Sequence, residues 1–247
     1  MYSKDHLETL FIEKLLYGGS GLSHIGSMAC FIDDVIPGET VSATITTVKK
    51  QYVTASLTEI CESSPHRINP ICAYFKYCGG CQWQHIDYHY QLHWKRLIVE
   101  DCLNRIGRMS DAAVLEIIPS DSQFQYRSRT NLKVSSSGIG YHQRGTRNII
   151  PVSCCPLLPP SLNQALSYAT NLHSKNTSLF KGITEIQLLL INRTQQVIIS
   201  LLNESELKAT LLYTPGGTTD VSINDIFLTA SEHSYCDIIS GITFYRR

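Results

Sequence analysis

Three cysteines lie close together in the segment PICAYFKYCGGCQWQH, at a C-x5-C-x2-C spacing: Cys72, Cys78 and Cys81. Thiolates are soft ligands, and four of them suit a zinc ion or an iron–sulfur cluster. Structural zinc sites usually take their ligands as two closely spaced pairs, whereas this loop supplies three thiols and needs one more. The adjacent glycines 79 and 80 let the backbone wrap closely and let its amides bond to sulfur. The spacing therefore favours an iron–sulfur cluster, with zinc as the alternative.

The fourth thiolate has two candidates far downstream, Cys154 and Cys155. Cys155 precedes Pro156, as some ligand cysteines of bacterial iron–sulfur clusters precede a proline. The chain has nine cysteines, an odd number, and its N-terminal residues do not read as a secretory signal, so we expect reduced thiols rather than a disulfide framework. The other cysteines are isolated and typical of small buried apolar residues: Cys30, Cys61, Cys102 and Cys236.

The residues before the cysteines predict a small all-β unit. Residues 41–46 alternate Val, Ala and Ile with Ser and Thr, and residues 53–57 repeat the pattern. Pro37 and Gly38 mark a turn between strands. Short alternating strands joined by turns are typical of a small barrel of the oligonucleotide-binding type.

A proline-rich linker at 62–70 precedes the cysteines, and a helix follows them over residues 87–107. Asp87 is placed to cap this helix and Gly107 to end it. Apolar residues cover about half of its circumference, which is wider than one contact face requires. Either the helix is buried between two layers, or it packs on something that the chain does not contain.

From residue 117 onward the pattern returns to strands, with a hairpin at 186–202 and a helix between the strands after the prolines at 156–160. No glycine-rich dinucleotide loop or P-loop is present. The predicted fold class is mainly β with α (α+β): a β-barrel over residues 1–61, followed by an α+β domain over residues 62–247.

Charge is balanced overall, with 21 basic and 21 acidic residues, but unevenly distributed. No acidic residue occurs from 122 to 184, which indicates either a phosphate-binding surface or a solvated face whose counter-charges come from elsewhere. The basic residues of this run are Arg127, Arg129, Lys133, Arg144, Arg147, Lys175 and Lys181. No apolar run is long enough to span a membrane, so we expect a soluble, cytoplasmic protein with no membrane partner.

The segment SPHRINPICAYFKYCGGCQWQHIDYHYQLHWKRLIVEDCLNRIG resembles the cluster segment of the RNA (uracil-5-)-methyltransferases, the family of the 23S rRNA m5U enzymes. Residues 8–60 resemble that family's TRAM domain, an RNA-binding β-barrel. The segment YRSRTNLKVSSSGIGYHQRGTRNIIPVSCCPLL resembles its central domain. The resemblance covers most of the chain. It implies a [4Fe–4S] cluster, with Arg127 approaching the target base and with these ligands: Cys72, Cys78, Cys81 and Cys155.

In that family a Rossmann-like domain follows, which binds S-adenosylmethionine (SAM) and carries a nucleophilic cysteine and a base. The resemblance implies that this domain is absent here, so that the chain has no catalytic residue and is inactive alone unless another chain supplies it. Cys236 lacks the context of the nucleophile. We expect a monomer that binds RNA, rRNA in preference to tRNA, with these contacts: Arg127, Arg129, Lys133, Arg144, Arg147 and Trp83.

Two other functions remain open. The chain could be a stand-alone RNA-binding module with a structural cluster and no catalytic activity, which SAM titration would test. An iron–sulfur electron carrier is less favoured, because ligands between RNA-binding elements are poorly placed for a redox partner. Tyr52, Trp83 and Tyr141 could stack on bases, but each could equally belong to the core.

Overall fold

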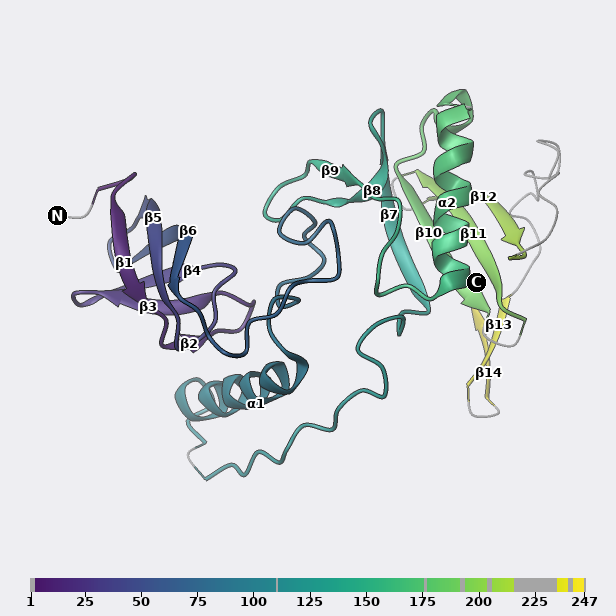
Figure 1. The fold of residues 1–247 in the computed structure, drawn as a ribbon. Helices are drawn as coiled ribbons and strands as arrows, with labels where there is room; N and C mark the ends of the chain where they lie inside the picture. Colours follow the sequence, from purple (N-terminus) through teal and green to yellow (C-terminus); the bar gives the residue numbers. More distant parts are fainter. Residues whose placement is uncertain are drawn as a thin grey trace. The chain divides into compact units, whose positions relative to one another are not determined.

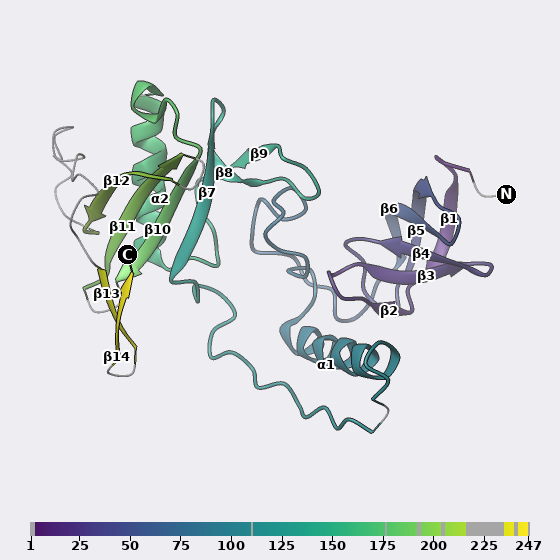
Figure 2. The same cartoon turned by 180° about the vertical axis from the view of Figure 1, so that it is seen from behind.

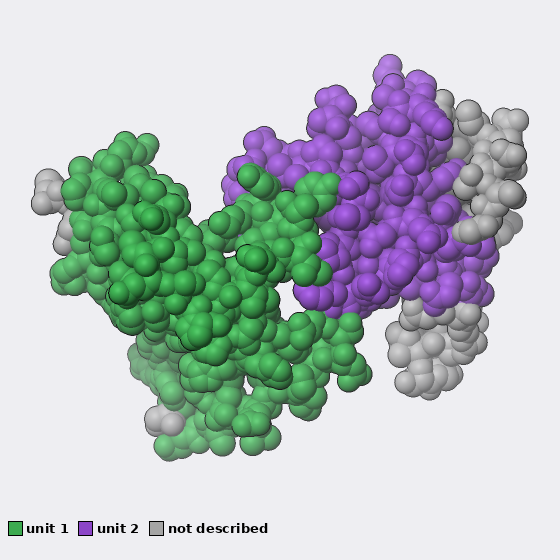
Figure 3. Space-filling model, in the orientation of Figure 1, with its two compact units in different colours: residues 1–123 green, residues 124–247 purple. Residues whose placement is uncertain are grey.

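The computed structural model describes residues 3–109, 111–175, 177–191, 194–203, 206–215, 235–239 and 242–246. The chain divides into two compact units, residues 1–123 and 124–247 (Figure 3). The boundary between the two compact units falls at residues 123/124. The domain division that the sequence predicts at residues 61/62 is a different boundary and stays a prediction. Sheets dominate both units, which agrees with the predicted α+β class. No helix in the described part of the chain is both long and apolar enough to cross a bilayer.

Unit 1 contains a six-stranded sheet in the order β1-β5-β6-β4-β3-β2 (Figure 1). Its strands are β1 (Leu7–Phe11), β2 (Lys14–Leu15), β3 (Gly21–Ile25), β4 (Met28–Ile32), β5 (Thr40–Val48) and β6 (Tyr52–Glu62). Neighbouring strands are antiparallel except β4 and β6, which are parallel.

The sheet of unit 1 is curled, because its two edge strands, β1 and β2, are joined by only Ile12 and Glu13. The amide of Ile12 bonds to the carbonyl of Glu39, and the amide of Glu13 bonds to the carbonyl of Leu22. The joining residues thus bond to two different segments, and no ladder between described strands closes the sheet. A closed form of the predicted β-barrel is therefore not found among the described strands.

Alternation along the strands builds the core of unit 1. Val41, Ala43 and Ile45 of β5 are fully buried, while Thr46 is exposed. The same cluster takes residues from the other strands of the sheet except β2, namely Leu10, Ile25, Cys30, Ile32, Val53 and Ala55, and from two connections, Ile12 and Val35.

Helix α1 (Tyr88–Arg105) lies within the range 87–107 that the sequence predicts. Asp87 caps it, accepting a hydrogen bond from the amide of Tyr90 at 3.0 Å. Of its side chains, all of them described, Trp94 is the one that is buried, in a small cluster with Leu15, Ile36 and Ile86. Val99 is 46% exposed. Helix α1 is therefore not buried between two layers within unit 1.

Unit 2 contains a second six-stranded sheet, antiparallel throughout, in the order β12-β11-β10-β7-β8-β9. Its strands are β7 (Arg129–Ser135), β8 (Gly138–His142), β9 (Ile149–Pro151), β10 (Glu185–Ile191), β11 (Gln196–Asn203) and β12 (Glu206–Tyr213). The predicted hairpin at 186–202 is confirmed as β10 and β11. A short helix η1 (Thr177–Phe180) and a hairpin of β13 (Tyr235–Ile239) and β14 (Ile242–Arg246) also belong to this unit.

Helix α2 (Pro160–Lys175) covers one face of this sheet and contacts β8, β10 and β11 (Figure 1). Its proline sits in the first turn, where the missing N–H costs no hydrogen bond. Leu162, Ala165, Leu166 and Ala169 are buried at helical spacing. The predicted helix after the prolines is confirmed.

Candidate functional site

The cysteine loop, defined here as residues 68–85, is closed at its base by a short antiparallel bridge between Arg67 and Ile86. The amide of Ile68 donates to the carbonyl of His85, and the amide of Asp87 donates to the carbonyl of His66, both at 2.9 Å. The two ends of the loop therefore lie side by side, and the three cysteines lie on the chain between them.

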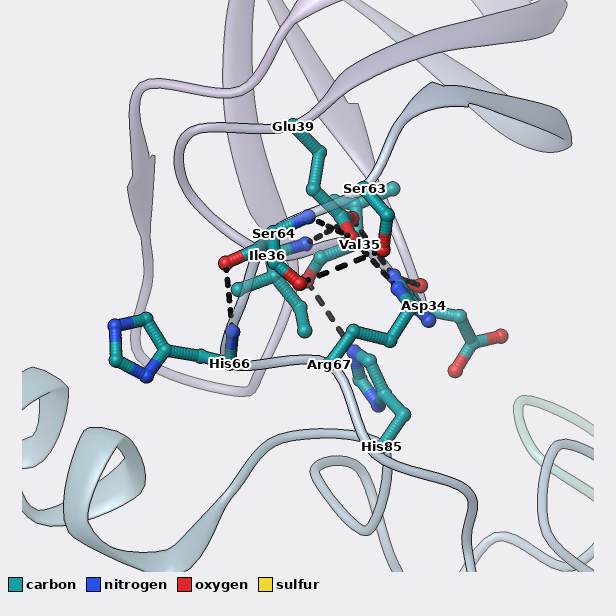
Figure 4. Close-up of polar contacts among 9 residues, drawn as sticks. All are labelled: Asp34, Val35, Ile36, Glu39, Ser63, Ser64, His66, Arg67 and His85. Carbon is teal, nitrogen blue, oxygen red and sulfur yellow. Dashed lines mark hydrogen bonds and ion pairs between the residues drawn. The ribbon is translucent and has the colours of Figure 1, made fainter.

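A buried ion pair anchors the first end of the loop to the sheet (Figure 4). Arg67 donates through Nε to Oε1 of Glu39 at 2.6 Å and through Nη2 to Oε2 at 2.7 Å. The amides of Ile36 and Ser64 donate to the same carboxylate at 2.8 and 3.3 Å. Arg67 Nη2 also donates to the carbonyl of Asp34 at 2.9 Å. The Glu39 side chain is fully buried, and its charge is met by four donors.

His85 anchors the other end of the loop. It is 2% exposed, and its Nε2 lies 3.3 Å from the carbonyl of Val35. Burial, with the Arg67 charge second, lowers the pKa of His85 to about 4. The ring is therefore neutral near pH 7, and Nε2 carries the proton that it donates to Val35.

Trp83 ties the loop to the turn between β2 and β3. Its indole Nε1–H donates to the carbonyl of Gly19 at 3.0 Å. A Cβ atom at Gly19 would lie 2.7 Å from Cβ of Gln82, so the turn and the loop pack closely. The indole N–H of Trp83 thus holds the loop to the turn, and the ring packs against the cluster that contains Trp94. The predicted stacking of Trp83 on RNA stays a prediction.

The predicted ligands fall in both units. Cys72, Cys78 and Cys81 are partly buried in unit 1, and the amide of Gly80 lies 3.4 Å from Sγ of Cys78, as a donor to sulfur. Cys155 is partly buried in unit 2, whereas Cys154 is exposed.

Asn163 of α2 fixes the backbone of Cys155. Its Oδ1 accepts from the amide of Cys155 at 2.8 Å, and its Nδ2 donates to the carbonyl at 3.1 Å.

A thiolate-bound metal suits the donor chemistry of these residues, but the described side chains do not assemble a complete site. No disulfide joins the eight cysteines that the structure describes. Within the same residues, no group of three or more His, Cys, Asp or Glu side chains is placed to hold a metal ion. Beside the cysteines, both polar atoms of the Gln84 amide and Nδ1 of His85 are buried without a hydrogen-bond partner. Cys236 lies in β13, whose side chains are outside the described part.

The predicted RNA contacts of unit 2 fall into two groups. Arg127 precedes β7, and Arg129 and Lys133 lie on it; Arg129 is exposed, while Lys133 forms an ion pair with Glu185 of β10. Arg144 and Arg147 lie in the loop between β8 and β9, with Arg147 exposed.

Sequence reasoning missed Glu39, because a charge beside a Pro-Gly turn is typical of a solvated position. It also missed the amide pair of Asn131 and Gln187, which lie opposite each other on β7 and β10. The alternation of β7 could have placed Asn131 on the face of Arg129. The partner strand could not be deduced from local pattern.

No protein-family model matches the chain. Among curated proteins, it is 34% identical over 165 residues to an uncharacterised RNA methyltransferase of Aquifex aeolicus (strain VF5), covering 67% of this chain and 39% of that protein. It is 38% identical over 154 residues to one from Nostoc sp. (strain PCC 7120), covering 60% and 34%. It is 31% identical over 159 residues to the 23S rRNA (uracil(1939)-C(5))-methyltransferase RlmD of Vibrio cholerae, covering 63% and 36%. The chain thus spans well under half the length of these relatives.

Among solved structures, the chain is similar to the tRNA (uracil-54, C5)-methyltransferase of Pyrococcus abyssi in complex with S-adenosyl-L-homocysteine. The TM-score is 0.59 at 21% identity, over 78% of this chain and 45% of that one. At this identity the likeness concerns the fold. The homologues are named RNA methyltransferases, and the fold agrees with that class.

Proposed function

We propose that this chain is the RNA-recognising part of a SAM-dependent RNA (uracil-5-)-methyltransferase, which makes 5-methyluridine in rRNA in preference to tRNA. The observation that carries the proposal is the likeness of about two thirds of the chain to curated RNA methyltransferases, one of them named for C5 methylation of uracil in 23S rRNA. Residues 1–61 are proposed as a TRAM-like RNA-binding unit and residues 62–247 as the central domain.

In this proposal the chain's residues hold RNA and do not perform the methyl transfer. Arg127 lies against the target base, Arg129, Lys133, Arg144 and Arg147 meet phosphates, and Trp83 contributes a ring. Methylation at C5 needs a covalent nucleophile and a proton-accepting catalytic group, and both must reach a uracil that is flipped out of its stack. These groups are assigned to a SAM-binding part outside these residues, so this monomeric chain alone is expected to be inactive.

A [4Fe–4S] cluster belongs to the same proposal, with Cys72, Cys78, Cys81 and Cys155 as its ligands. The cluster supplies a structural cross-link among its four ligands and takes no redox part. The amide of Gly80 donates to the sulfur of Cys78, and Asn163 positions the backbone of Cys155. The alternatives are zinc as the metal and Cys154 as the fourth ligand.

The metal is tested by measuring iron, acid-labile sulfide and zinc per chain after anaerobic purification. We expect about four irons and four sulfides, as a [4Fe–4S] cluster requires. One zinc without sulfide would overturn the cluster. Cys155→Ser is expected to abolish metal retention, and Cys154→Ser, its neighbour, is the matched control. Equal loss in both variants would overturn the choice of Cys155.

RNA recognition is tested by fluorescence anisotropy with the full chain, comparing a 23S rRNA fragment with a tRNA at fixed salt. We expect the rRNA fragment to bind more tightly than the ~10⁻⁴ to 10⁻⁶ M that is typical of non-specific binding. Binding no tighter than this range to either RNA would overturn the proposal. The stand-alone binding module is favoured instead if RNA binds tightly but a SAM-binding chain from a relative restores no methyl transfer.

A further inference from the structure

The sheet of unit 2 has one face under α2 and one face that no described helix covers (Figure 2). On β7, Thr130 and Leu132 are buried, while Arg129 and Asn131 are exposed. Because side chains alternate along a strand, Arg129, Asn131 and Lys133 share the face opposite the buried residues. This face is turned away from α2.

The register of β7 with β10 sets the composition of that face. Asn131 lies opposite Gln187, and Lys133 lies opposite Glu185. Nε2 of Gln187 donates to Oδ1 of Asn131 at 3.2 Å. Lys133 and Glu185 form an ion pair, so their charges cancel. We call these residues the polar face: Arg129, Asn131, Lys133, Glu185 and Gln187.

The amide pair retains hydrogen-bonding capacity for a ligand. One donor and one acceptor are used between Asn131 and Gln187, and whichever way the two amides are assigned, one amino group and one oxygen, on neighbouring strands, remain for a ligand. An adjacent donor and acceptor match the edge of an unpaired base, such as O4 and N3–H of uracil. Bases of single-stranded RNA expose these edges, whereas paired RNA hides them.

The charge of the polar face fits a phosphate backbone. Its acidic residue, Glu185, is already paired with Lys133, and Arg129 is exposed two positions from Asn131 on the same strand. The sequence from 122 to 184 contributes no acidic side chain to oppose it.

We propose that the polar face binds single-stranded RNA, with Arg129 on a phosphate and the Asn131–Gln187 pair on a base edge, while the ion pair with Glu185 keeps Lys133 from the phosphate contact assigned to it above. This inference rests on the proposed function and deepens it by naming the residues that read a base. It also predicts that the Glu185→Gln variant binds RNA more tightly than the unmodified chain, because loss of the carboxylate frees the Lys133 cation beside the RNA.

The test is anisotropy of a uridine-containing single-stranded oligonucleotide with the full chain, between about 50 and 200 mM salt. Each phosphate contact contributes about 0.7 to the slope of log K against log salt on single strands. Arg129→Gln is expected to lower the slope by about 0.7, and Glu185→Gln to raise it by about 0.7 and to tighten binding. Asn131→Ala is expected to weaken binding about fivefold, with the slope unchanged.

Lys175→Gln is the matched control, since it removes one exposed positive charge at the end of α2, the helix that covers the other face. If Lys175→Gln lowers the slope as much as Arg129→Gln does, the assignment of RNA binding to the polar face is overturned. So would weaker binding in Glu185→Gln, and tighter binding there cannot come from misfolding. If the unmodified chain fails to bind RNA, the proposed function itself falls; if it binds and the polar-face variants match Lys175→Gln, only this inference falls.

Discussion

Replacing Glu39 by glutamine removes the charge of a buried carboxylate while nearly keeping the shape of its side chain. Each oxygen of Glu39 accepts two hydrogen bonds: Oε1 from Arg67 and the amide of Ser64, and Oε2 from Arg67 and the amide of Ile36. In the Glu39→Gln variant the new amino group must face two donors, whichever way the amide turns. We expect this substitution to release the first end of the cysteine loop from the sheet.

The cost follows from burial. Breaking a buried ion pair by removing one partner costs about 3–5 kcal/mol, because the remaining charge is uncompensated. The Arg67 side chain is 17% exposed, and in the variant it still donates a hydrogen bond to the carbonyl of Asp34. We therefore expect a cost at the lower end of this range, about 3 kcal/mol. At a urea dependence of about 2 kcal/mol per M, the unfolding midpoint falls by about 1.5 M.

Tryptophan fluorescence during urea unfolding measures this loss, since both tryptophans, Trp83 and Trp94, lie in unit 1. Glu100→Gln is the matched control: its pair with Arg96 is on the surface of α1, and its loss costs at most about 0.5 kcal/mol. If the two variants differ by less than about 1 kcal/mol, the reasoning is wrong. Adding Arg67→Met to Glu39→Gln should restore part of the stability, because no unpaired charge is then buried.

Two further predictions concern the same unit. Because burial lowers the pKa of His85 from 6.5 to about 4, the unfolded chain binds the extra proton first, so stability is full above pH 6.5 and declines by up to about 3 kcal/mol as pH falls towards 4. Urea midpoints at about pH 7 and about pH 4.5 should show a smaller decline in His85→Gln, and an equal decline in both proteins would contradict this role. Gly18→Ala and Gly19→Ala both place alanine at positive φ, 95° and 101°, but only the Cβ at position 19 meets Gln82 and Trp83. Gly19→Ala should therefore be the less stable variant, with a shifted tryptophan emission, and equal behaviour of the two would show that the turn does not pack against the loop.

Local patterns predicted the elements of the fold well. The alternation of Val41, Ala43 and Ile45 gave a strand with one buried side, and Asp87 caps the helix that follows it in the predicted way. The apolar runs on either side of residue 194 formed the expected hairpin. These features depend on neighbours in the sequence, so the residues themselves carry the information.

Contacts between distant segments could not be predicted in the same way. Arg67 lies in a stretch that is typical of a linker, yet its guanidinium reaches Glu39, 28 residues earlier. The parallel pairing of β4 with β6 and the opposition of Asn131 and Gln187 depend on the order of strands in the sheet. Alternation gives the face of a strand but not its neighbour, which is why the polar pairs emerged only with the register.

The paired ends of the cysteine loop make it an insert that can change without changing its host. Both ends are held at the Arg67–Ile86 bridge, and their bonding partners, Glu39 and Val35, lie in the connection between β4 and β5 of the unit 1 sheet. Closing a longer loop costs little more than closing a shorter one, about 0.6 kcal/mol for each doubling of length. Evolution could therefore lengthen, shorten or replace the segment between the anchors while the sheet below kept its fold, and a protein engineer could exchange it for another binding loop at the same two points.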